Sequence, residues 1–436
     1  MLKETQATAS QVRRILSPCS GGLSPEAVKG LLTKGDAFYT KYGTDLSAVF
    51  ADAAQRGGGV LVLNLAGDDD RSPLNAHLAE SQQEKLELAV KAVAEAAGIQ
   101  EVYVVKPPEL AYQPQAIDVK TIDAARCAVL REEYTLYHLM ETGELRSCPM
   151  EKDFPSQGYQ NRPTILADAE TFCRIYEAAA SDGAPSKLVV IKDAKESCLT
   201  EVKTGTPVAA LLSECGFEAE KGVLAGGVLG EYIPAGDLAQ RTIENTADWD
   251  SIRVYGKQDC LAQEALQLAQ EAKQDSCGKC VLCREGTWHF LGYTKDITGG
   301  KAKKEDLAML LDIAPLIRIG AFCSFGQKMA RAIGSLAEHN RAELEAHITK
   351  KTCPAGVCSA FSKLVIDPAK CTGCGDCLDV CEEDAITGKK KFIHMIDADM
   401  CENCGECQKA CEEGAVVMQD GTIRVPKKLV RVGKFK

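Results

Sequence analysis

The chain has 436 residues, which is enough for two to four domains that each bury their own core. Apolar residues make up 45% and charged residues 26%, as in ordinary globular proteins. No run of about 18 apolar residues predicts a transmembrane helix, and the net charge of −11 disfavours general binding to nucleic acid. The start lacks a basic stretch followed by an apolar run, so we expect no signal peptide and a cytosolic protein.

The N-terminal region is expected to form an α/β domain over residues 1–182. Residues 1–50 are mostly helical in pattern, with a helix-start signal at Ser24-Pro25-Glu26. The apolar run 60–65 predicts a buried strand, residues 81–97 have helical spacing, and 101–105 predicts a second strand. This order is a β-α-β unit and indicates an α/β layer fold.

Three further regions follow along the chain. Residues 183–252 predict a smaller β-rich module, with a strand at 188–191, a helix at 207–215 and a glycine-rich segment at 223–230. Residues 253–350 are almost wholly helical in pattern. From residue 364 the chain is short and repeated, because CTGCGDCLDVCEEDAI at 371–386 recurs as CENCGECQKACEEGAV at 401–416, offset by 30 residues. A duplication of this size is typical of a two-cluster ferredoxin module.

The 21 cysteines are unevenly distributed. Fourteen fall between Cys277 and Cys411, whereas the other seven are scattered between Cys19 and Cys260. Closely spaced C-x2-C pairs in a chain without an expected signal peptide indicate metal ligands rather than disulfides.

Each copy of the repeat has the spacing C-x2-C-x2-C-x3-C. In this pattern three thiolates bind one [4Fe–4S] cluster and the fourth binds the other cluster of the pair. We therefore predict two crossed ligand sets, which are Cys371, Cys374, Cys377 and Cys411 for one cluster and Cys401, Cys404, Cys407 and Cys381 for the other. Zinc is the alternative, but zinc sites pair two C-x2-C units rather than run three cysteines at three-residue steps.

The repeat departs from the usual bacterial pattern in its acidic residues. Glu382 and Glu412 stand where proline commonly follows the fourth cysteine, and each is followed by another glutamate. We expect these pairs to lower the cluster potentials and to repel acidic partners. The basic tail, 421–436, has no such acids, and it is either a solvated end or a docking segment for an acidic partner.

A third [4Fe–4S] site is predicted in the helical region. Cys277, Cys280 and Cys283 have the spacing of three ligands on one loop, and Cys323 follows forty residues later as a fourth ligand.

The residues around this site resemble one known family. SCGKCVLCREGTWHFL at 276–291, AFCSFGQ around Cys323 and KKTCPAGVCSAF at 350–361 are similar to the NADH-binding flavoprotein subunit of respiratory complex I and of soluble NAD-linked hydrogenases and formate dehydrogenases. The resemblance implies a multidomain α/β + α protein. Its parts are a flavin-type α/β domain (1–182), a β-grasp module of the soluble-ligand-binding (SLBB) type (183–252), a helical [4Fe–4S] domain (253–350), a hinge (351–366) and a ferredoxin domain (367–420).

The family's flavin site, by contrast, is degenerate in this chain. The motif GRGGAGF corresponds to 34–38 around Gly35, GxGAYxCGEETAL corresponds to 124–133, and NNVET corresponds to 167–171, where both asparagines are gone. Three glycine positions carry Ala124, Arg126 and Arg131, and only the pair Glu132-Glu133 is kept. Long side chains there would occupy the space of a flavin, so we expect FMN and NADH binding to be lost. The alternative is that Arg126 or Arg131 contacts a different anion.

Cys353 and Cys358 are left over from the three clusters. A C-x4-C pair with a histidine and a third cysteine suits structural zinc, and the candidates are Cys260 and His347, with His339 as a substitute. Soluble members of the family resemble this in carrying a metal-bound hinge before the ferredoxin domain. The alternative is a pair of buried free thiols, the interpretation we give to Cys19, Cys127, Cys148, Cys173, Cys198 and Cys215.

These patterns predict an electron-transfer subunit with no catalytic residues of its own. It would pass single electrons through three clusters within an NAD(P)H- or ferredoxin-linked oxidoreductase of an anaerobe or facultative anaerobe. Its partners would be a flavoprotein or catalytic subunit and free ferredoxin. Two alternatives stay open, namely an FMN-containing NAD(P)H dehydrogenase subunit with a diverged site, and a structural subunit whose clusters stabilise a complex. The sequence leaves open whether the complex bifurcates electrons.

Overall fold

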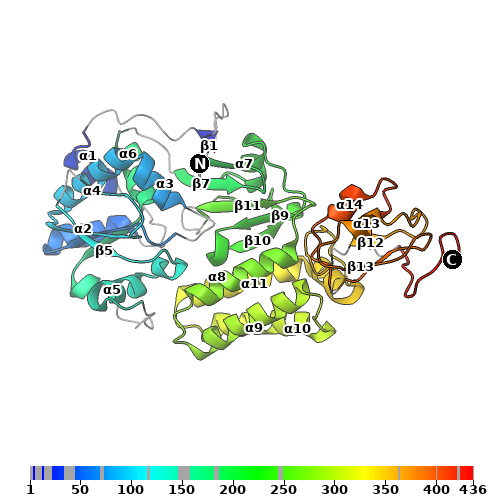
Figure 1. Cartoon of the computed structure of the whole chain (residues 1–436). Coiled ribbons are helices and arrows are strands. Elements are labelled where there is room, and N and C mark those ends of the chain that lie inside the picture. Colours follow the sequence, from blue (N-terminus) through cyan, green and yellow to red (C-terminus); the bar gives the residue numbers. More distant parts are fainter. Residues whose placement is uncertain are drawn as a thin grey trace. The chain divides into compact units, whose positions relative to one another are not determined.

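The computed structural model describes most of the chain, namely residues 3–4, 12–13, 22–33, 45–68, 73–114, 118–145, 158–180, 186–243, 249–361, 364–398, 400–419 and 423–435. It divides into two compact units. Figure 1 labels the helices and strands and colours the chain from its N-terminus to its C-terminus. The first comprises Met1–Lys257, Gln267–Leu291 and Ala308–His339, and the second Gln258–Leu266, Gly292–Leu307 and Asn340–Lys436.

The first unit begins with a parallel four-stranded sheet in the order β5-β4-β3-β6. Its strands are β3 (Val60–Asn64), β4 (Glu101–Lys106), β5 (Lys120–Asp123) and β6 (Thr164–Ala167). The helices are α1 (Pro25–Thr33), α2 (Leu46–Arg56), α3 (Leu74–Ser81), α4 (Gln83–Ala97), α5 (Glu133–Thr142) and α6 (Ala169–Ala180). Because helices cover the sheet, β3 is buried along its whole length, and α1, α3, α4 and α6 pack on one another.

A second sheet in the same unit is mixed, with the order β1-β8-β7-β11-β9-β10 and β2 also paired to β8. Its main strands are β7 (Ser186–Lys192), β8 (Ser197–Lys203), β9 (Gly222–Ala225), β10 (Glu231–Pro234) and β11 (Ser251–Tyr255), with helix α7 (Val208–Glu214) between β8 and β9. Strand β7 is parallel to β11 and antiparallel to β8.

The helical region consists of α8 (Leu261–Asp275), α9 (Val281–Thr298), α10 (Lys304–Gly320), α11 (Ser324–His339) and α12 (Arg341–Glu345), followed by a π-helical turn (Ala346–Lys350). Within the first unit α11 packs against β10, where Ser335 accepts the Tyr232 N–H and Arg331 donates to the Gly230 carbonyl.

The C-terminal part of the second unit has internal pseudo-symmetry. Strand β12 (Leu364–Ile366) pairs with β15 (Val416–Met418), and β13 (Ile386–Thr387) pairs with β14 (Met395–Ile396). The short helices α13 (Asp376–Asp379) and α14 (Glu406–Ala410) each follow a glycine in the left-handed conformation, Gly375 and Gly405. The predicted duplication is therefore confirmed as a repeat of structure.

Most sequence predictions of elements are confirmed. The β-α-β unit over 60–105 forms β3, α4 and β4, and α1 begins at Pro25, where Ser24 Oγ accepts the Ala27 N–H. The helical prediction for residues 1–50 is wrong in part, because β1 (Lys3–Glu4) and β2 (Val12–Arg13) pair with β8. Sheet edges offer unpaired backbone groups that such short segments can satisfy. None of the helices in the described ranges is long and apolar enough to cross a membrane.

Candidate functional site

The structure brings the four cysteines of the helical region together in the first unit. Cys280, Cys283 and Cys323 are buried, and Cys277 is half-buried. Burial, together with the neighbouring thiols of Cys323, Cys280 and Cys277, raises the pKa of Cys283 to about 11. The Phe322 N–H lies 3.5 Å from Cys280 Sγ, and Ser276 Oγ lies 3.5 Å from Cys283 Sγ. The donor set and its N–H and O–H partners fit the thiolate ligation of an iron–sulfur cluster.

Helix α11 begins directly after Cys323 and is fixed by a distant residue. Glu132 is buried, and its carboxylate accepts the Ser324 N–H at 2.6 Å. Gly326, on the first turn, has no room for a side chain, because a Cβ would lie 2.6 Å from Ala321 Cβ and 3.4 Å from Cys283 Sγ. Glu132 was expected to mark a remnant of the flavin site, yet it also anchors the helix that follows the fourth cysteine.

The cysteines of the repeat lie near one another in the second unit. Burial raises the pKa of Cys377 to about 12, and the neighbouring thiols that add to this are Cys371, Cys374, Cys411 and Cys407. Burial likewise raises the pKa of Cys407, where the contributing thiols are Cys401, Cys404 and Cys381. Each group of neighbours contains the distant fourth cysteine of the other repeat copy, which fits two clusters with exchanged ligands.

The two cysteine loops differ at one equivalent position. Gly373 has a φ of +70° and its Cβ position lies 2.6 Å from the Phe392 carbonyl oxygen, so the main chain passes too close for any side chain. Asn403 occupies the same place in the second loop with a φ of +58°, and its side-chain oxygen accepts the Leu364 N–H at 3.3 Å. Its own N–H lies 3.4 Å from Cys401 Sγ. The second loop is more open and admits asparagine, which tolerates this conformation.

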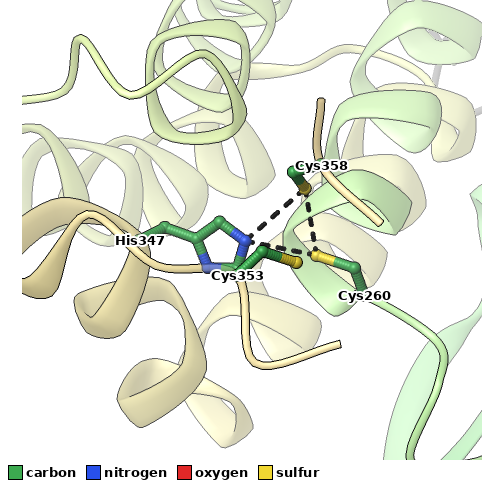
Figure 2. Close-up of side chains that lie close together, drawn as sticks. All are labelled: Cys260, His347, Cys353 and Cys358. Atoms are coloured by element: carbon green, nitrogen blue, oxygen red, sulfur yellow. Dashed lines mark hydrogen bonds between the residues drawn. The ribbon is translucent and has the colours of Figure 1, made fainter. Parts of the chain in front are cut away.

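A second kind of site lies in the second unit (Figure 2). Cys260, His347, Cys353 and Cys358 place their ligand atoms within 4.8 Å of one another. Cys260 Sγ lies 3.3 Å from His347 Nε2 and 3.5 Å from Cys358 Sγ, and Cys358 Sγ lies 3.5 Å from His347 Nε2. Four tetrahedral ligands at about 2.3 Å (sulfur) and 2.0 Å (nitrogen) from zinc are roughly 3.5–3.8 Å apart, so this set fits a single zinc ion.

The histidine of this site is oriented by the main chain. His347 is fully buried, and its Nδ1 lies 2.8 Å from the Glu343 carbonyl, so Nδ1 carries the proton and Nε2 faces the thiols. Burial lowers the pKa of His347, but the hydrogen bonds with Cys260 and Glu343 outweigh it and raise the pKa to about 9. The contact with Cys358 and burial raise the pKa of Cys260. The substitute ligand, His339, instead stacks on Tyr232 with ring centroids 6.3 Å apart.

The carboxyl edge of the parallel sheet is where ligands bind in many α/β folds, and here it holds a buried ion pair. Arg131, in a 3-10 turn after β5, donates through Nε to the carbonyl of Gly67, just beyond β3. Its Nη2 lies 3.1 Å from Asp250 Oδ2, and the two side chains are only 4% and 2% exposed. A Cβ on Gly67 would meet Arg131 Cγ at 3.3 Å. The arginine therefore occupies the space above this edge.

Other polar groups at this edge bond to one another. Asn64 Nδ2 donates to the Leu130 carbonyl, and Asn75 Nδ2 donates to Asp68 Oδ1 at 2.8 Å. Asp168 Oδ1 accepts from the N–H and hydroxyl of Thr171 at the start of α6. Residues of the predicted flavin motifs thus serve as internal caps and cross-links. A flavin needs free backbone groups and space, and these described groups instead bond within the chain.

The remaining predicted residues have separate surroundings. Arg126 is half-buried, and Glu133 accepts the Tyr137 hydroxyl while burial raises its pKa. Gly35 lies outside the described residues, as do Cys19 and Cys148. Cys127 and Cys173 are buried thiols whose pKa values burial raises to about 12. Cys198 is also buried and contacts Cys215.

Two families match parts of the chain. Residues 263–347 match the "NADH-ubiquinone oxidoreductase-F iron-sulfur binding region", and residues 370–415 match the "4Fe-4S dicluster domain". Among whole proteins, the NADP-reducing hydrogenase subunit HndC of Solidesulfovibrio fructosivorans is 31% identical over 309 residues, which are 64% of this chain and 61% of HndC. The F subunit of the NADH-quinone oxidoreductase of Streptomyces coelicolor is 33% identical over 130 residues, 30% of this chain and 26% of that protein. The chain is a homologue of these two proteins.

The comparison with solved structures covers a similar share of the chain. A crystal structure of an NAD+-reducing [NiFe]-hydrogenase in the H2-reduced state superposes with a TM-score of 0.66 at 19% identity, and covers 75% of this chain and 63% of that chain. This homologue of HndC thus has a mixed α/β fold similar to that of the matched hydrogenase chain, with [4Fe–4S]-binding domains. It spans about 61% of the length of HndC and about a quarter of the length of the Streptomyces protein.

Proposed function

We propose that this chain is the iron–sulfur electron-transfer subunit of an oxidoreductase complex, that it holds three [4Fe–4S] clusters, and that it binds no flavin of its own. The observation that carries the proposal is a contrast. Cysteines gather in the helical region and in the repeat, whereas the sheet edge that would face a flavin is filled by the Arg131–Asp250 pair. The clusters, when bound, would each accept and release one electron at a time.

The chain's own residues then set the properties of these sites. N–H groups of Phe322, Asn403 and Ala415 point at Cys280, Cys401 and Cys411 with N···S distances of 3.5, 3.4 and 3.3 Å. Such donors favour the more negative, reduced state of a cluster and so raise its potential. The glutamates after Cys381 and Cys411 act in the opposite direction. The main-chain contact at Gly373 holds the first ferredoxin loop in one conformation.

Exposed apolar residues support assembly with another redox protein. Val281 and Leu282 lie between ligands of the helical site, Phe322 lies next to Cys323, and all three are 45–60% exposed. Ile319 is 85% exposed beside a cleft of about 450 Å³ that Arg318, Lys328 and Arg331 also line. A concentration of exposed apolar side chains around a cluster site is typical of a protein interface. We assign this face to a partner that exchanges electrons with the Cys277–Cys323 site.

The four-residue site is proposed to hold structural zinc rather than to react. Its ligands come from the residue before α8, the π-helical turn and the segment before β12. Zinc bound there would hold the 351–366 segment to the helical region within the second unit, because its ligands come from both. Protein groups would fill all four coordination positions, as in structural zinc sites.

The wider assignments follow the same proposal. Residues 1–182 would be a flavin-type α/β domain without its flavin, 183–252 an SLBB-like β-grasp module, 253–350 the helical [4Fe–4S] domain, 351–366 a hinge and 367–420 the ferredoxin domain. The complex would be cytoplasmic, since thiolate sites persist in a reducing compartment. It would also be NAD(P)H- or ferredoxin-linked. Any flavin that splits electron pairs would belong to a partner subunit.

The test uses the full chain, reconstituted anaerobically with iron and sulfide. We expect about twelve irons per chain, no FMN released on denaturation, and three one-electron signals in a reductive titration followed by electron paramagnetic resonance. About eight irons would contradict the helical cluster. A flavin absorption band that NADH bleaches would instead identify a dehydrogenase subunit with a diverged site. Clusters that no redox protein reduces or oxidises at catalytic rates would assign the chain a structural role.

A further inference from the structure

The C-terminal segment 423–435 packs against the ferredoxin-like part of the second unit, where it is drawn in red in Figure 1. The Ile393 N–H donates to the Val430 carbonyl at 2.9 Å, and the Val432 N–H donates to the Lys391 carbonyl at 3.1 Å. Val430 and Phe435 also pack on the core around Ile393. Of the two interpretations of the tail, a solvated end or a docking segment, this packing argues against the first for these residues.

This packing concentrates positive charge. Lys389, Lys390, Lys391, Arg431 and Lys434 are exposed, and we call them the basic face. Lys389 Nζ lies 4.5 Å from the centre of the Phe392 ring and the Arg431 guanidinium lies 5.8 Å from it, so both cations share one aromatic surface. The segments 385–396 and 423–435 contain no acidic residue. Within the described parts of the chain, no carboxylate forms an ion pair with these five cations.

The basic face adjoins a predicted cluster. The Lys391 N–H donates to the Gly373 carbonyl at 3.1 Å, and Gly373 lies between Cys371 and Cys374 on the first ferredoxin loop. Cys374 is exposed. A protein bound over the basic face would therefore lie beside the loop that supplies three of the four ligands.

We propose that the basic face is the docking surface for an acidic one-electron carrier of the ferredoxin class. This inference rests on the proposed function and names the partner at one end of the relay. A negatively charged carrier is attracted by the five cations, and the exposed Leu429 and Val432, 45% and 37% exposed, add apolar contact. In the exchange one electron leaves the carrier's reduced cluster and enters the cluster of the first loop, and no proton or group is transferred.

Another acidic macromolecule fits less well. Glu382, Glu383, Glu412 and Glu413, the exposed glutamates expected to repel acidic partners, do not belong to the basic face. A nucleic acid or an anionic membrane covers a larger area than a small carrier and would meet these glutamates as well as the basic face. The whole chain is also strongly acidic, with a net charge of −11. A small carrier needs only a local patch of opposite charge. Because the basic face lies next to a cluster loop, a carrier bound there would be close to the cluster with which it exchanges electrons.

The decisive experiment measures binding of a small acidic two-cluster ferredoxin to the full reconstituted chain as a function of salt. Lys389→Glu/Lys390→Glu/Lys391→Glu is compared with Lys301→Glu/Lys303→Glu/Lys304→Glu, which makes the same change in net charge at exposed lysines elsewhere in the second unit. We expect the wild-type affinity to fall as salt rises, and the first variant to weaken binding by roughly 10- to 100-fold at low salt. The control variant keeps at least a third of the wild-type affinity.

A second variant with glutamine at 389–391 removes the three charges without reversing them, and we expect it to bind with a milder loss of affinity. The iron content and absorbance of each variant show whether it still folds and holds its clusters.

Three results would overturn the docking surface. The first is equal binding by both glutamate variants, and the second is wild-type binding that does not weaken with salt. The third is loss of binding to a labelled oligonucleotide or an anionic vesicle in the first variant while ferredoxin binding is unchanged, which would assign the face to a polyanion. A failure of the proposed function would give a different result. A photoreduced deazaflavin reduces clusters without docking at the basic face, so clusters that accept no electrons from it would contradict the electron-transfer function itself.

Discussion

The carboxyl edge of the parallel sheet and the cysteine loops show two opposite uses of polar side chains. At the sheet edge Arg131, Asn64 and Asp68 bond to other groups of the chain itself, and the ion pair with Asp250 is almost fully buried. At the cysteine loops the thiols lie close together, and N–H groups point at Cys280, Cys401 and Cys411. The polar groups of the sheet edge bind one another, whereas the thiols of the cysteine loops are arranged to bind the iron atoms of the proposed clusters.

The comparison suggests what the N-terminal domain does under the proposed function. The sheet, its helices and the link from Glu132 to α11 support the helix that follows Cys323. The domain would then serve as a scaffold for the cluster site and need no ligand of its own.

The largest effect is expected at a cysteine loop, from Gly373→Ala. The new methyl group would lie 2.6 Å from the Phe392 carbonyl oxygen and φ is +70°, so the loop cannot keep its path. We expect iron to fall from about twelve to about eight atoms per chain after reconstitution. Gly405→Ala is the matched control, because φ is +82° but no atom lies within 4 Å of its Cβ position. Iron analysis that finds the two variants alike would refute the role given to the Phe392 contact.

A second effect is expected at the four-residue site. Cys260→Ser or His347→Ala removes one of four ligands, so zinc should fall from about one atom per chain to near zero while iron is unchanged. Trypsin cleavage after the exposed Lys350 and Lys351 would then become faster. Cys173→Ser, a buried thiol in α6, is the control and keeps its zinc. Elemental analysis of zinc and iron measures both outcomes, and a wild-type chain without zinc would favour free thiols.

The smallest effect concerns the closed sheet edge. Arg131→Gly leaves the Asp250 carboxylate buried without its partner, which lowers the free energy of unfolding by about 3–5 kcal/mol. Arg131→Gly/Asp250→Asn should recover part of that loss. Urea unfolding followed by Trp249 fluorescence in a Trp288→Phe background measures it, since Trp249 is buried next to Asp250.

The same variant sharpens the comparison in a second way. We expect no FMN binding by Arg131→Gly, because Asn64, Asp68 and Asp168 still bond within the chain. Micromolar FMN affinity in a fluorescence titration would show that Arg131 alone closes the edge. Arg126→Gly, at a half-buried position, is the control for the loss of an arginine in this segment.

Local spacing allowed much of this molecule to be predicted from its sequence. The cysteine repeats predicted the two-cluster domain that the family match shows, and apolar periodicity predicted β3, α4 and β4. The crossed ligand sets stay a prediction. Long-range pairings were beyond this reasoning. Arg131 meets Asp250 across 119 positions and Glu132 meets Ser324 across 192, and no local pattern distinguishes such partners. The choice between His347 and His339 likewise depends on where the π-helical turn points the ring.

The Arg131–Asp250 pair also bears on the evolutionary history open to this chain. Replacing either residue alone leaves a charge buried without its partner, so both single-step intermediates are less stable than the present protein. A ligand-binding sheet edge would need two coordinated substitutions in this chain, and more where Asn64 and Asp68 are engaged. Under the proposed function, single substitutions would therefore not give this chain a flavin site, and flavin chemistry would stay with a partner.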